Sequence, residues 1–382
     1  MQTRTKDEAL NPFPWYRLMR ETQPVYYNPQ YRFWQVFGYE DVQRVLSDYT
    51  SFSSVFGGGG ERRDPLGSSL ISMDPPRHRQ LRNLVTQAFT PRSVARLSER
   101  ITAIVNELLD RVAATGHMDI IDDLSYPLPV IVIAEMLGIP QEDRERFKVW
   151  SDAVVGATHS ERGDPQAEMS EYFLDMIQQR RREPEDDLIS ALLDAQIDGQ
   201  HLNQRELLGF CILLLVAGNE TTTNLIGNAL LCFDEHPEVM EQLRSEPELV
   251  PGAIEEVLRY RSPVQFMYRR AVADITIRDQ EIRTGQMVLA WIGSANRDEA
   301  QFPDPDRFDI RRTPNRHIAF GHGIHFCLGA PLARLEAKIA LTILLERLHE
   351  IKRVPDIPLE ATGSNVVYGV KHLPITFRHR AK

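Results

Sequence analysis

The segment Phe320-Gly321-His322-Gly323-Ile324-His325-Phe326-Cys327-Leu328-Gly329 surrounds one cysteine with glycines and leads directly into the helix-forming sequence APLARLEAKIALTILLERL. Glycines allow tight backbone turns and a close approach of the main chain to a flat ligand. The start of a helix stabilises a nearby thiolate and lowers the pKa of its thiol. The pattern therefore favours a thiolate held toward a metal. From these residues alone, a buried structural cysteine is equally compatible.

The same segment is similar, position for position, to F-G-x-G-x-H-x-C-x-G, the haem-binding loop of the cytochrome P-450 family. The resemblance implies a haem b cofactor (iron protoporphyrin IX), with Cys327 as the axial thiolate ligand of its iron. A thiolate ligand donates electron density to the iron and favours O–O bond cleavage. The resemblance further implies that His325 binds a haem propionate, and that Phe320, Gly321 and Gly329 contact the cofactor. Without it, His325 would be a capping or core histidine.

A second signal is Ala217-Gly218-Asn219-Glu220-Thr221-Thr222-Thr223, a polar cluster within an apolar helical run. A threonine can hydrogen-bond to the preceding turn, and a glycine removes a side chain, so the helix can open locally into a groove. Taken alone, the cluster is more typical of a packing face with one solvated glutamate. It resembles the family's oxygen-binding motif A-G-x-[DE]-T-T. That resemblance implies that Thr221 and Glu220 are the catalytic alcohol and acid, and that Ala217 and Gly218 lie against the haem.

A third signal is the pair Glu256 and Arg259, one turn apart in a predicted helix. Such pairs are common on surfaces and contribute only about 0.2–0.5 kcal/mol. The pair resembles the family's E-x-x-R, and the segment from 302 to 308 resembles the irregular stretch that completes its ion-pair network. The resemblance implies a structural network of Glu256, Arg259 and Arg307.

A fourth signal is the sequence from Asp74 to Arg82, in which His78 and Arg82 share one face of a predicted helix. It resembles the D-P-P-x-H-x-x-x-R segment of bacterial members, whose histidine and arginine bind a haem propionate. Arg269 matches a further propionate contact, although its neighbour Arg270 is an alternative. Basic side chains from distant segments would then neutralise the two carboxylates of a buried cofactor.

The fold class predicted is mainly α with small β-sheets. Aromatic and β-branched runs at 25–27 and 33–37 predict a hairpin, and a capping box at Asn203 and Glu206 predicts a helix of about thirty residues that ends at His236-Pro237. We expect a single domain over 1–382, α-rich at about 76–260 and 327–350 and β-rich at about 24–38, 273–292 and 354–378. The resemblance implies the triangular cytochrome P-450 fold, with haem between the long central helix and the helix after Cys327.

Composition limits the function classes. A net charge of −10 argues against nucleic-acid binding, and three cysteines give no disulfide framework, which fits a reducing compartment. The longest apolar stretch, Leu207 to Gly218, is twelve residues, shorter than the roughly 20 of a membrane-spanning helix. The first residues contain no apolar leader. We therefore expect a cytoplasmic protein of the soluble bacterial type, not bound to a membrane.

The function predicted is that of a haem-thiolate monooxygenase, which inserts one atom of dioxygen into a hydrophobic small molecule by hydroxylation or epoxidation. The chain length leaves no room for a fused reductase, so electrons would come from a separate ferredoxin or flavodoxin with its reductase. We expect the protein to be a monomer. A patch of Arg77, Arg79, Arg311, Arg312 and Lys338 is a candidate docking site for that acidic partner. The alternatives are a peroxygenase driven by hydrogen peroxide and a non-enzymatic haem sensor or carrier.

Analogy with the family predicts a substrate pocket of apolar or small residues, suited to a fatty acid, terpenoid, steroid or macrolide-like compound. The glycines at 57–60 indicate a mobile lid, and solvated charges are the favoured interpretation of Arg62 and Arg63. The predicted pocket residues are Phe56, Leu70, Val155, Val216, Val264, Phe266, Met267, Val366 and Val367.

Overall fold

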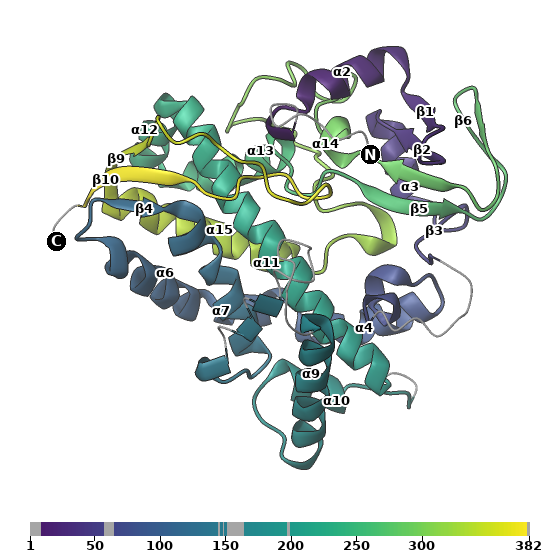
Figure 1. Ribbon diagram of the computed structural model, residues 1–382, viewed down its shortest axis with the longest axis horizontal. Helices are drawn as coiled ribbons and strands as arrows, with labels where there is room; N and C mark the ends of the chain where they lie inside the picture. The colour runs from purple at the N-terminus through teal and green to yellow at the C-terminus, as the bar shows by residue number, and fades with distance from the viewer. Residues whose placement is uncertain are drawn as a thin grey trace.

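A single long helix, α11 (Gln204–Glu235), crosses the centre of the computed structural model, which describes residues 9–56, 65–143, 146–147, 149–150, 164–196 and 199–379 (Figure 1). The predicted capping box is present: the Asn203 side chain accepts from the Glu206 amide at 3.0 Å, and the Glu206 carboxylate accepts from the Asn203 amide at 3.0 Å. The helix ends before Pro237, since a proline disfavours helical geometry in the residue preceding it. The predicted helix of about thirty residues is confirmed, at 32.

Helix α11 would be long and apolar enough to cross a membrane, and 61% of its most apolar 18-residue window is buried inside the protein. Most of the other helices pack against it or against its neighbour α15, whereas those at the edge near the largest sheet pack mainly on one another (Figure 1). Besides α11 and α15 (Ala330–Arg347), the α-helices are α2 (Phe13–Thr22), α3 (Tyr39–Ser47), α4 (Arg77–Ala88), α5 (Pro91–Arg96), α6 (Ser98–Val112), α7 (Pro127–Met136), α9 (Pro165–Arg182), α10 (Leu188–Asp194), α12 (Pro237–Ser245), α13 (Val250–Tyr260) and α14 (Ile292–Ala295). Short 3-10 or π turns are η1 (Pro65–Ser68), η2 (Leu70–Ser72), η3 (Ile121–Ser125), η4 (Gln141–Asp143), η5 (Pro247–Leu249) and η6 (Gly323–His325).

Three small sheets lie at the edges of this helical body (Figure 1). The largest has the order β1-β2-β8-β5-β3, the second β4-β10-β9, and the third is the hairpin β6-β7. The predicted hairpin at 25–37 is confirmed, because β1 pairs with β2 in antiparallel register. The strands are β1 (Val25–Asn28), β2 (Phe33–Val36), β3 (Phe52–Ser53), β4 (His117–Asp119), β5 (Met267–Ala271), β6 (Ile275–Ile277), β7 (Gln280–Ile282), β8 (Met287–Ala290), β9 (Leu348–Arg353) and β10 (Pro374–His379).

Two predicted boundaries are wrong. Strand β9 begins at Leu348, before the predicted β-rich part at 354–378, since α15 ends at Arg347 and the following residues pair with β10. Strand β5 likewise precedes the predicted start at 273, because it fills the gap between β8 and β3. Both strands are held by partners remote in sequence, which local patterns do not reveal.

A buried ion pair fixes the irregular chain between α14 and the cysteine loop. Arg259 and Glu256 on α13 are both fully buried and form a bidentate pair, with N···O distances of 2.8 and 2.7 Å. The remaining donors of Arg259 reach the carbonyls of Asn296 at 3.0 Å, Pro305 at 2.8 Å and Arg307 at 3.1 Å. This pair therefore anchors three separate points of a segment that has no regular hydrogen-bond ladder.

The predicted role of the Arg307 side chain is wrong. Arg307 contributes its main-chain carbonyl, and its side chain is exposed. The second guanidinium beside Glu256 belongs to Arg312, whose Nε lies 3.3 Å from Oε1. The Asp309 amide also donates to Glu256, at 2.9 Å. The chain turns within this segment, so that residue 312, rather than 307, directs its side chain inward.

Replacement of Arg259 by leucine should lower the free energy of unfolding by about 3–5 kcal/mol, because it leaves the buried Glu256 carboxylate without its charged partner. The matched control is Arg307→Leu, which keeps the carbonyl and should change stability by less than about 0.5 kcal/mol. Urea unfolding of both variants measures the difference. Equal losses would contradict the assignment of roles to these two arginines.

Candidate functional site

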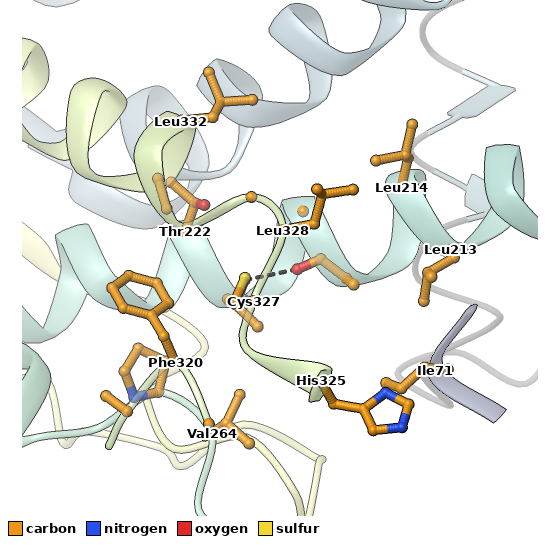
Figure 2. Close-up of a pocket in the computed structure, with 18 of the residues that line it drawn as sticks. Ile71, Leu213, Leu214, Thr222, Val264, Phe320, His325, Cys327, Leu328 and Leu332 are labelled. Carbon is orange, nitrogen blue, oxygen red and sulfur yellow. Dashed lines mark hydrogen bonds between the residues drawn. The ribbon is translucent and has the colours of Figure 1, made fainter. Parts of the chain in front are cut away.

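A cavity of about 270 Å³ lies between α11 and the loop that carries Cys327 (Figure 2). Cys327, Thr221 and Arg269 all border it, although they come from three distant parts of the chain. Most of the remaining lining is apolar: Leu46, Leu70, Ile71, Phe89, Ile133, Met136, Phe210, Leu213, Leu214, Leu225, Leu258, Val264, Met267, Ile292, Phe320, Leu328 and Leu332. The cavity thus joins a thiol, an alcohol and a cation to a hydrophobic chamber.

Two glycines shape the cysteine loop. Gly321 and Gly323 have φ angles of 74° and 73°, in the left-handed region that residues with a Cβ rarely adopt. A Cβ on Gly323 would also lie 2.7 Å from the Cα of Ser47. The Cys327 amide donates to the carbonyl of Phe320 at 2.9 Å, which closes the loop. The sequence therefore folds here into a tight turn that sets the thiol at the cavity wall, where α15 begins.

The electrostatics of Cys327 differ from the prediction made from helix position alone. Burial raises the pKa of the Cys327 thiol, and this effect is the largest. The amides of Gly329 and Ala330 and the charge of Arg82 act in the opposite direction. The start of α15 does favour the thiolate, but it does not outweigh desolvation.

Four basic side chains gather at one end of the cavity. His78 and His325 lie with ring centroids 4.3 Å apart, and the Nε2 atom of each is buried without a hydrogen-bond partner. Arg269 is 3% exposed, and Arg82 lines the same cavity. Burial, as the largest cause, and the neighbouring arginines together lower the pKa of His78 to about 4 and that of His325 to about 3.

This cluster has little negative charge of its own. Asp74 interacts with both Arg269 and His78, but its carboxylate accepts from the Ser53 hydroxyl at 2.5 Å and the Ser54 amide at 3.0 Å. Buried cations and unpartnered ring nitrogens are costly unless an anion reaches them. The four side chains therefore form a site suited to an anionic group. A carboxylate can accept hydrogen bonds from their guanidinium and ring N–H groups.

Helix α11 presents Thr221 to the cavity and keeps Glu220 away from it. The Thr221 hydroxyl donates to the Ala217 carbonyl at 2.6 Å, and the helix stays α-helical through this segment, without the local opening that was predicted. Gly218 borders the cavity, and the Ile133 side chain occupies the space that a Cβ there would need. The alcohol thus lies at the wall, with its oxygen free to accept a hydrogen bond from a cavity guest.

Comparison with known proteins identifies the family. The family model for cytochrome P450 matches residues 146–367. The chain is 47% identical over 379 residues to a putative cytochrome P450, YjiB, of Bacillus subtilis strain 168, with 96% of this chain and 94% of the relative covered. The chain belongs to the cytochrome P450 family. It is also 42% identical over 379 residues to a mycinamicin IV hydroxylase/epoxidase of Micromonospora griseorubida, covering 95% and 94% of the two chains.

A solved P450 structure confirms the predicted fold class. The crystal structure of CYP109E1 from Bacillus megaterium in complex with testosterone superposes with a TM-score of 0.91 at 45% identity, covering 98% of this chain and 99% of that chain. The α-rich fold with small sheets is therefore the cytochrome P450 fold. As a P450 monooxygenase, the protein is an enzyme of a family that uses haem with a cysteine thiolate ligand.

The residues of this P450 fit a haem. The unpartnered nitrogens of His78 and His325 and the buried Arg269 are groups that the two propionates would satisfy. All the predicted cofactor residues line the cavity except His78, whose ring lies beside that of His325 at an interplanar angle of 59°. Those in the lining are Arg82, Ala217, Gly218, Arg269, Phe320, Gly321, His325, Cys327 and Gly329.

The predicted substrate-pocket residues lie only partly in the cavity lining. Leu70, Val264 and Met267 line the cavity of the P450. Phe266, just before β5, does not, because it is buried against Trp291, with ring centroids 4.8 Å apart. The predicted residues outside the lining also include Phe56, Val216, Val366 and Val367. Val366 packs against the cluster around Trp291, and Val367 bridges Val264 through the main chain. Val155, the glycines at 57–60, Arg62 and Arg63 lie outside the described residues.

Sequence reasoning missed one face of α11 and one residue of α15. Phe210, Leu213 and Leu214 precede Ala217, Gly218, Thr221, Thr222 and Leu225 at helical spacing, and all of them line the cavity. Spacings of three and four along a helix place residues on one face, so this row was detectable once Thr221 was assigned to the site. Glu336 also lines the cavity, nine residues after Cys327, but no motif indicated its role.

Replacement of Arg269 by glutamine should weaken haem retention by about 10- to 100-fold, as expected for the loss of a charge-assisted hydrogen bond worth about 1.5–3 kcal/mol. Arg270→Gln is the matched control, because alternate residues of β5 face opposite sides and Arg270 does not line the cavity. Transfer of haem to an excess of a scavenging haem protein measures the loss. Faster transfer from the Arg270 variant would instead assign the propionate contact to Arg270.

Proposed function

We propose that this P450 is a haem-thiolate monooxygenase that hydroxylates or epoxidises an uncharged hydrophobic molecule with electrons from a separate protein. The observation that carries the proposal is the joint presence of Cys327, Thr221 and the basic cluster at one largely apolar cavity. When bound, haem with a thiolate ligand supplies the activation of dioxygen and the transfer of one of its atoms. The protein supplies binding, orientation, a dry chamber and protons.

The loop that carries Cys327 and the basic cluster would bind and orient the haem. Cys327 would ligate the iron, with its sulfur supported by the Gly329 and Ala330 amides. Arg82, Arg269 and the two histidines would hold the propionates. Amide donors toward a ligating sulfur reduce its charge density, so they moderate the thiolate without displacing it.

Proton delivery falls to α11. The Thr221 hydroxyl already donates to Ala217, so its oxygen would accept a proton donor, such as a water, from the cavity. Glu220 precedes it but does not line the cavity. The acid would therefore exchange protons with the far side of the helix and pass them on through Thr221 or a water, while the apolar lining keeps bulk solvent out.

The mostly apolar residues that line the cavity favour an uncharged substrate. In the part of the chain that the structure describes, the ionisable side chains of the cavity are those at the cofactor edge, His322, Cys327 and Glu336, and none of them lies among the apolar residues of α7 and the first half of α11. A carboxylate there would have no cation to pair with. Among the related proteins, CYP109E1 was crystallised with testosterone, and another is a mycinamicin IV hydroxylase/epoxidase. We infer a steroid-, terpenoid- or macrolide-like substrate rather than a free fatty acid.

The predicted partner patch is smaller than the sequence indicated. Arg77 pairs with Glu206, Arg311 pairs with Glu246, and Arg312 lies beside Glu256, so their charges are compensated within the protein. Arg79 and Lys338 remain exposed. We propose a ferredoxin or flavodoxin in the cytoplasm as the electron donor, with contacts that depend on charge less than five free cations would imply.

The oxidised and carbon monoxide-bound reduced spectra of the wild type should carry the bands of thiolate ligation, and Cys327→Ser should abolish them. Titration with neutral steroids should shift the iron toward high spin, and a fatty acid of similar size should do so at least about tenfold more weakly, as expected for burial of an unpaired carboxylate. Thiolate bands in the serine variant would refute the ligand assignment. Tighter binding of the fatty acid would refute the substrate class.

Thr221→Ala should reduce product formed per electron consumed by at least about tenfold, since a positioned proton-transfer group contributes about 10²–10⁴ in rate. Its matched control is Thr223→Val, because Thr223 points away from the cavity and donates to the Ser125 carbonyl at 3.0 Å. Haem spectra should be intact in both variants. Equal coupling in the two would remove Thr221 from proton delivery, and wild-type turnover that is as fast with hydrogen peroxide alone as with a reductase would favour the peroxygenase.

A further inference from the structure

One carboxylate joins the two ends of the cysteine loop. Glu255 of α13 accepts hydrogen bonds from Arg334, which follows the loop on α15, with N···O distances of 2.7 and 2.8 Å. Its Oε2 atom also lies 3.0 Å from Nε2 of His317, which precedes the loop. The loop at 318–329 is therefore closed at its base by side chains from both of its ends. We call Glu255, His317 and Arg334 the loop clamp.

The hydrogen bonds of the loop clamp fix its charges as well as its geometry. Nδ1 of His317 accepts from the Ala319 amide at 3.2 Å, so Nε2 carries the ring hydrogen and donates it to Glu255. Desolvation acts to raise the pKa of Glu255, but the hydrogen bonds from Arg334 and His317 outweigh it and lower that pKa to about 2. Glu255 therefore stays ionised at neutral pH and holds Arg334 by a bidentate, charge-assisted pair.

The guanidinium that Glu255 holds lies over the ring of Phe320. The Cζ atom of Arg334 is 4.4 Å from the ring centroid, within the range of a cation–π interaction. Phe320 and Cys327 both line the cavity (Figure 2), and the Phe320 carbonyl accepts from the Cys327 amide at 2.9 Å. Arg334 does not line the cavity. The loop clamp thus holds a positive charge just outside the part of the wall that Phe320 and Cys327 form.

Two arginine charges act on the Cys327 sulfur in the direction that favours its thiolate, those of Arg82 and Arg334. Arg82 belongs to the basic cluster, where a propionate would compensate its charge. Arg334 has a different counter-ion, Glu255, which the bidentate pair keeps on the α13 side of the guanidinium. A positive charge near a ligating sulfur draws electron density from it and stabilises the reduced, more negative state of the metal.

We propose that Glu255, His317 and Arg334 are positioning residues that hold a positive charge behind Phe320 and thereby raise the reduction potential of iron ligated by Cys327. The inference deepens the proposed function and rests on its assignment of Cys327 as the ligand. The step concerned is a one-electron transfer, in which the partner protein is oxidised and the iron is reduced. The loop clamp forms and breaks no bond in this step, and a higher potential makes the transfer more favourable.

Arg334→Gln should lower the reduction potential of the haem-loaded protein, because it removes the charge while keeping a hydrogen-bond donor for Glu255. We expect a change of at least about threefold in the reduction equilibrium, or about 30 mV at about 59 mV per tenfold for one electron. A spectroscopic redox titration with mediator dyes and no partner protein measures this change. Lys338→Gln is the matched control, since Lys338 is an exposed cation one turn further along α15, and its potential should shift by less than half as much.

Arg334→Lys keeps the charge but not the planar fork, so its potential should lie between those of the wild type and Arg334→Gln. An unchanged potential in Arg334→Gln, or an equal shift in Lys338→Gln, would overturn the inference, and normal thiolate bands in these proteins would confine that failure to the loop clamp. A wild type without thiolate bands would refute Cys327 as the ligand, and the inference would then fail together with the proposed function.

A double-mutant cycle tests whether Glu255 positions Arg334. The Arg334 side chain is already 37% exposed, so in a Glu255→Gln background the released guanidinium should move into solvent, where its charge is screened. Arg334→Gln should therefore shift the potential of the Glu255→Gln protein by less than half of its effect in the wild type. Equal shifts in the two backgrounds would contradict the loop clamp.

Discussion

The buried ion pair between Glu256 and Arg259 is the interaction on which the position of the cysteine loop depends. The chain from 296 to 316 contains no helix or strand in the structure, so its carbonyl groups need partners from elsewhere. Arg259 supplies donors to three of them, and Glu256 accepts from the Asp309 amide. A charge pair this deep is costly to desolvate, and it is stabilising here because nearly every donor and acceptor is used. The irregular segment thereby delivers Phe320 to the cavity at a fixed point.

Two groups of ionisable side chains at the cavity respond to burial in opposite ways. At one edge, Arg269 and His78 are buried and Arg82 and His325 are partly buried, with little negative charge around them, a state that becomes favourable when an anion is bound. On the α15 side, Glu336 is buried, desolvation raises its pKa to about 8, and no charged group among the described residues offsets that effect. An arginine cannot give up its proton, whereas a carboxyl group can readily keep one. Burial therefore leaves an arginine as a cation that an anion can bind, whereas it favours the neutral, protonated form of a carboxyl group.

Local patterns predicted the features that local physics determines. The capping box, the proline after α11, the glycines of the cysteine loop and the Glu256–Arg259 spacing all act within a few residues of chain, and each was found where the sequence indicated. Other contacts join residues far apart in sequence. Arg312, rather than Arg307, lies beside Glu256, Arg77 pairs with Glu206, and Thr222 hydrogen-bonds to Glu336. Those contacts depend on how helices and loops are oriented after packing, which residue spacing does not encode.

The row of α11 residues along the cavity explains how one helix separates substrate binding from chemistry. Phe210, Leu213 and Leu214 lie near its beginning, and Thr221 and Thr222 lie two turns or more further on. At 1.5 Å per residue, about 10–18 Å of helix separates the apolar from the hydroxyl-bearing end. Gly218 lies between them, with Ile133 packed against its Cα. A rigid, continuous helix therefore fixes the distance between the part of the cavity that selects an apolar molecule and the part that handles protons, and a change at one end need not disturb the other.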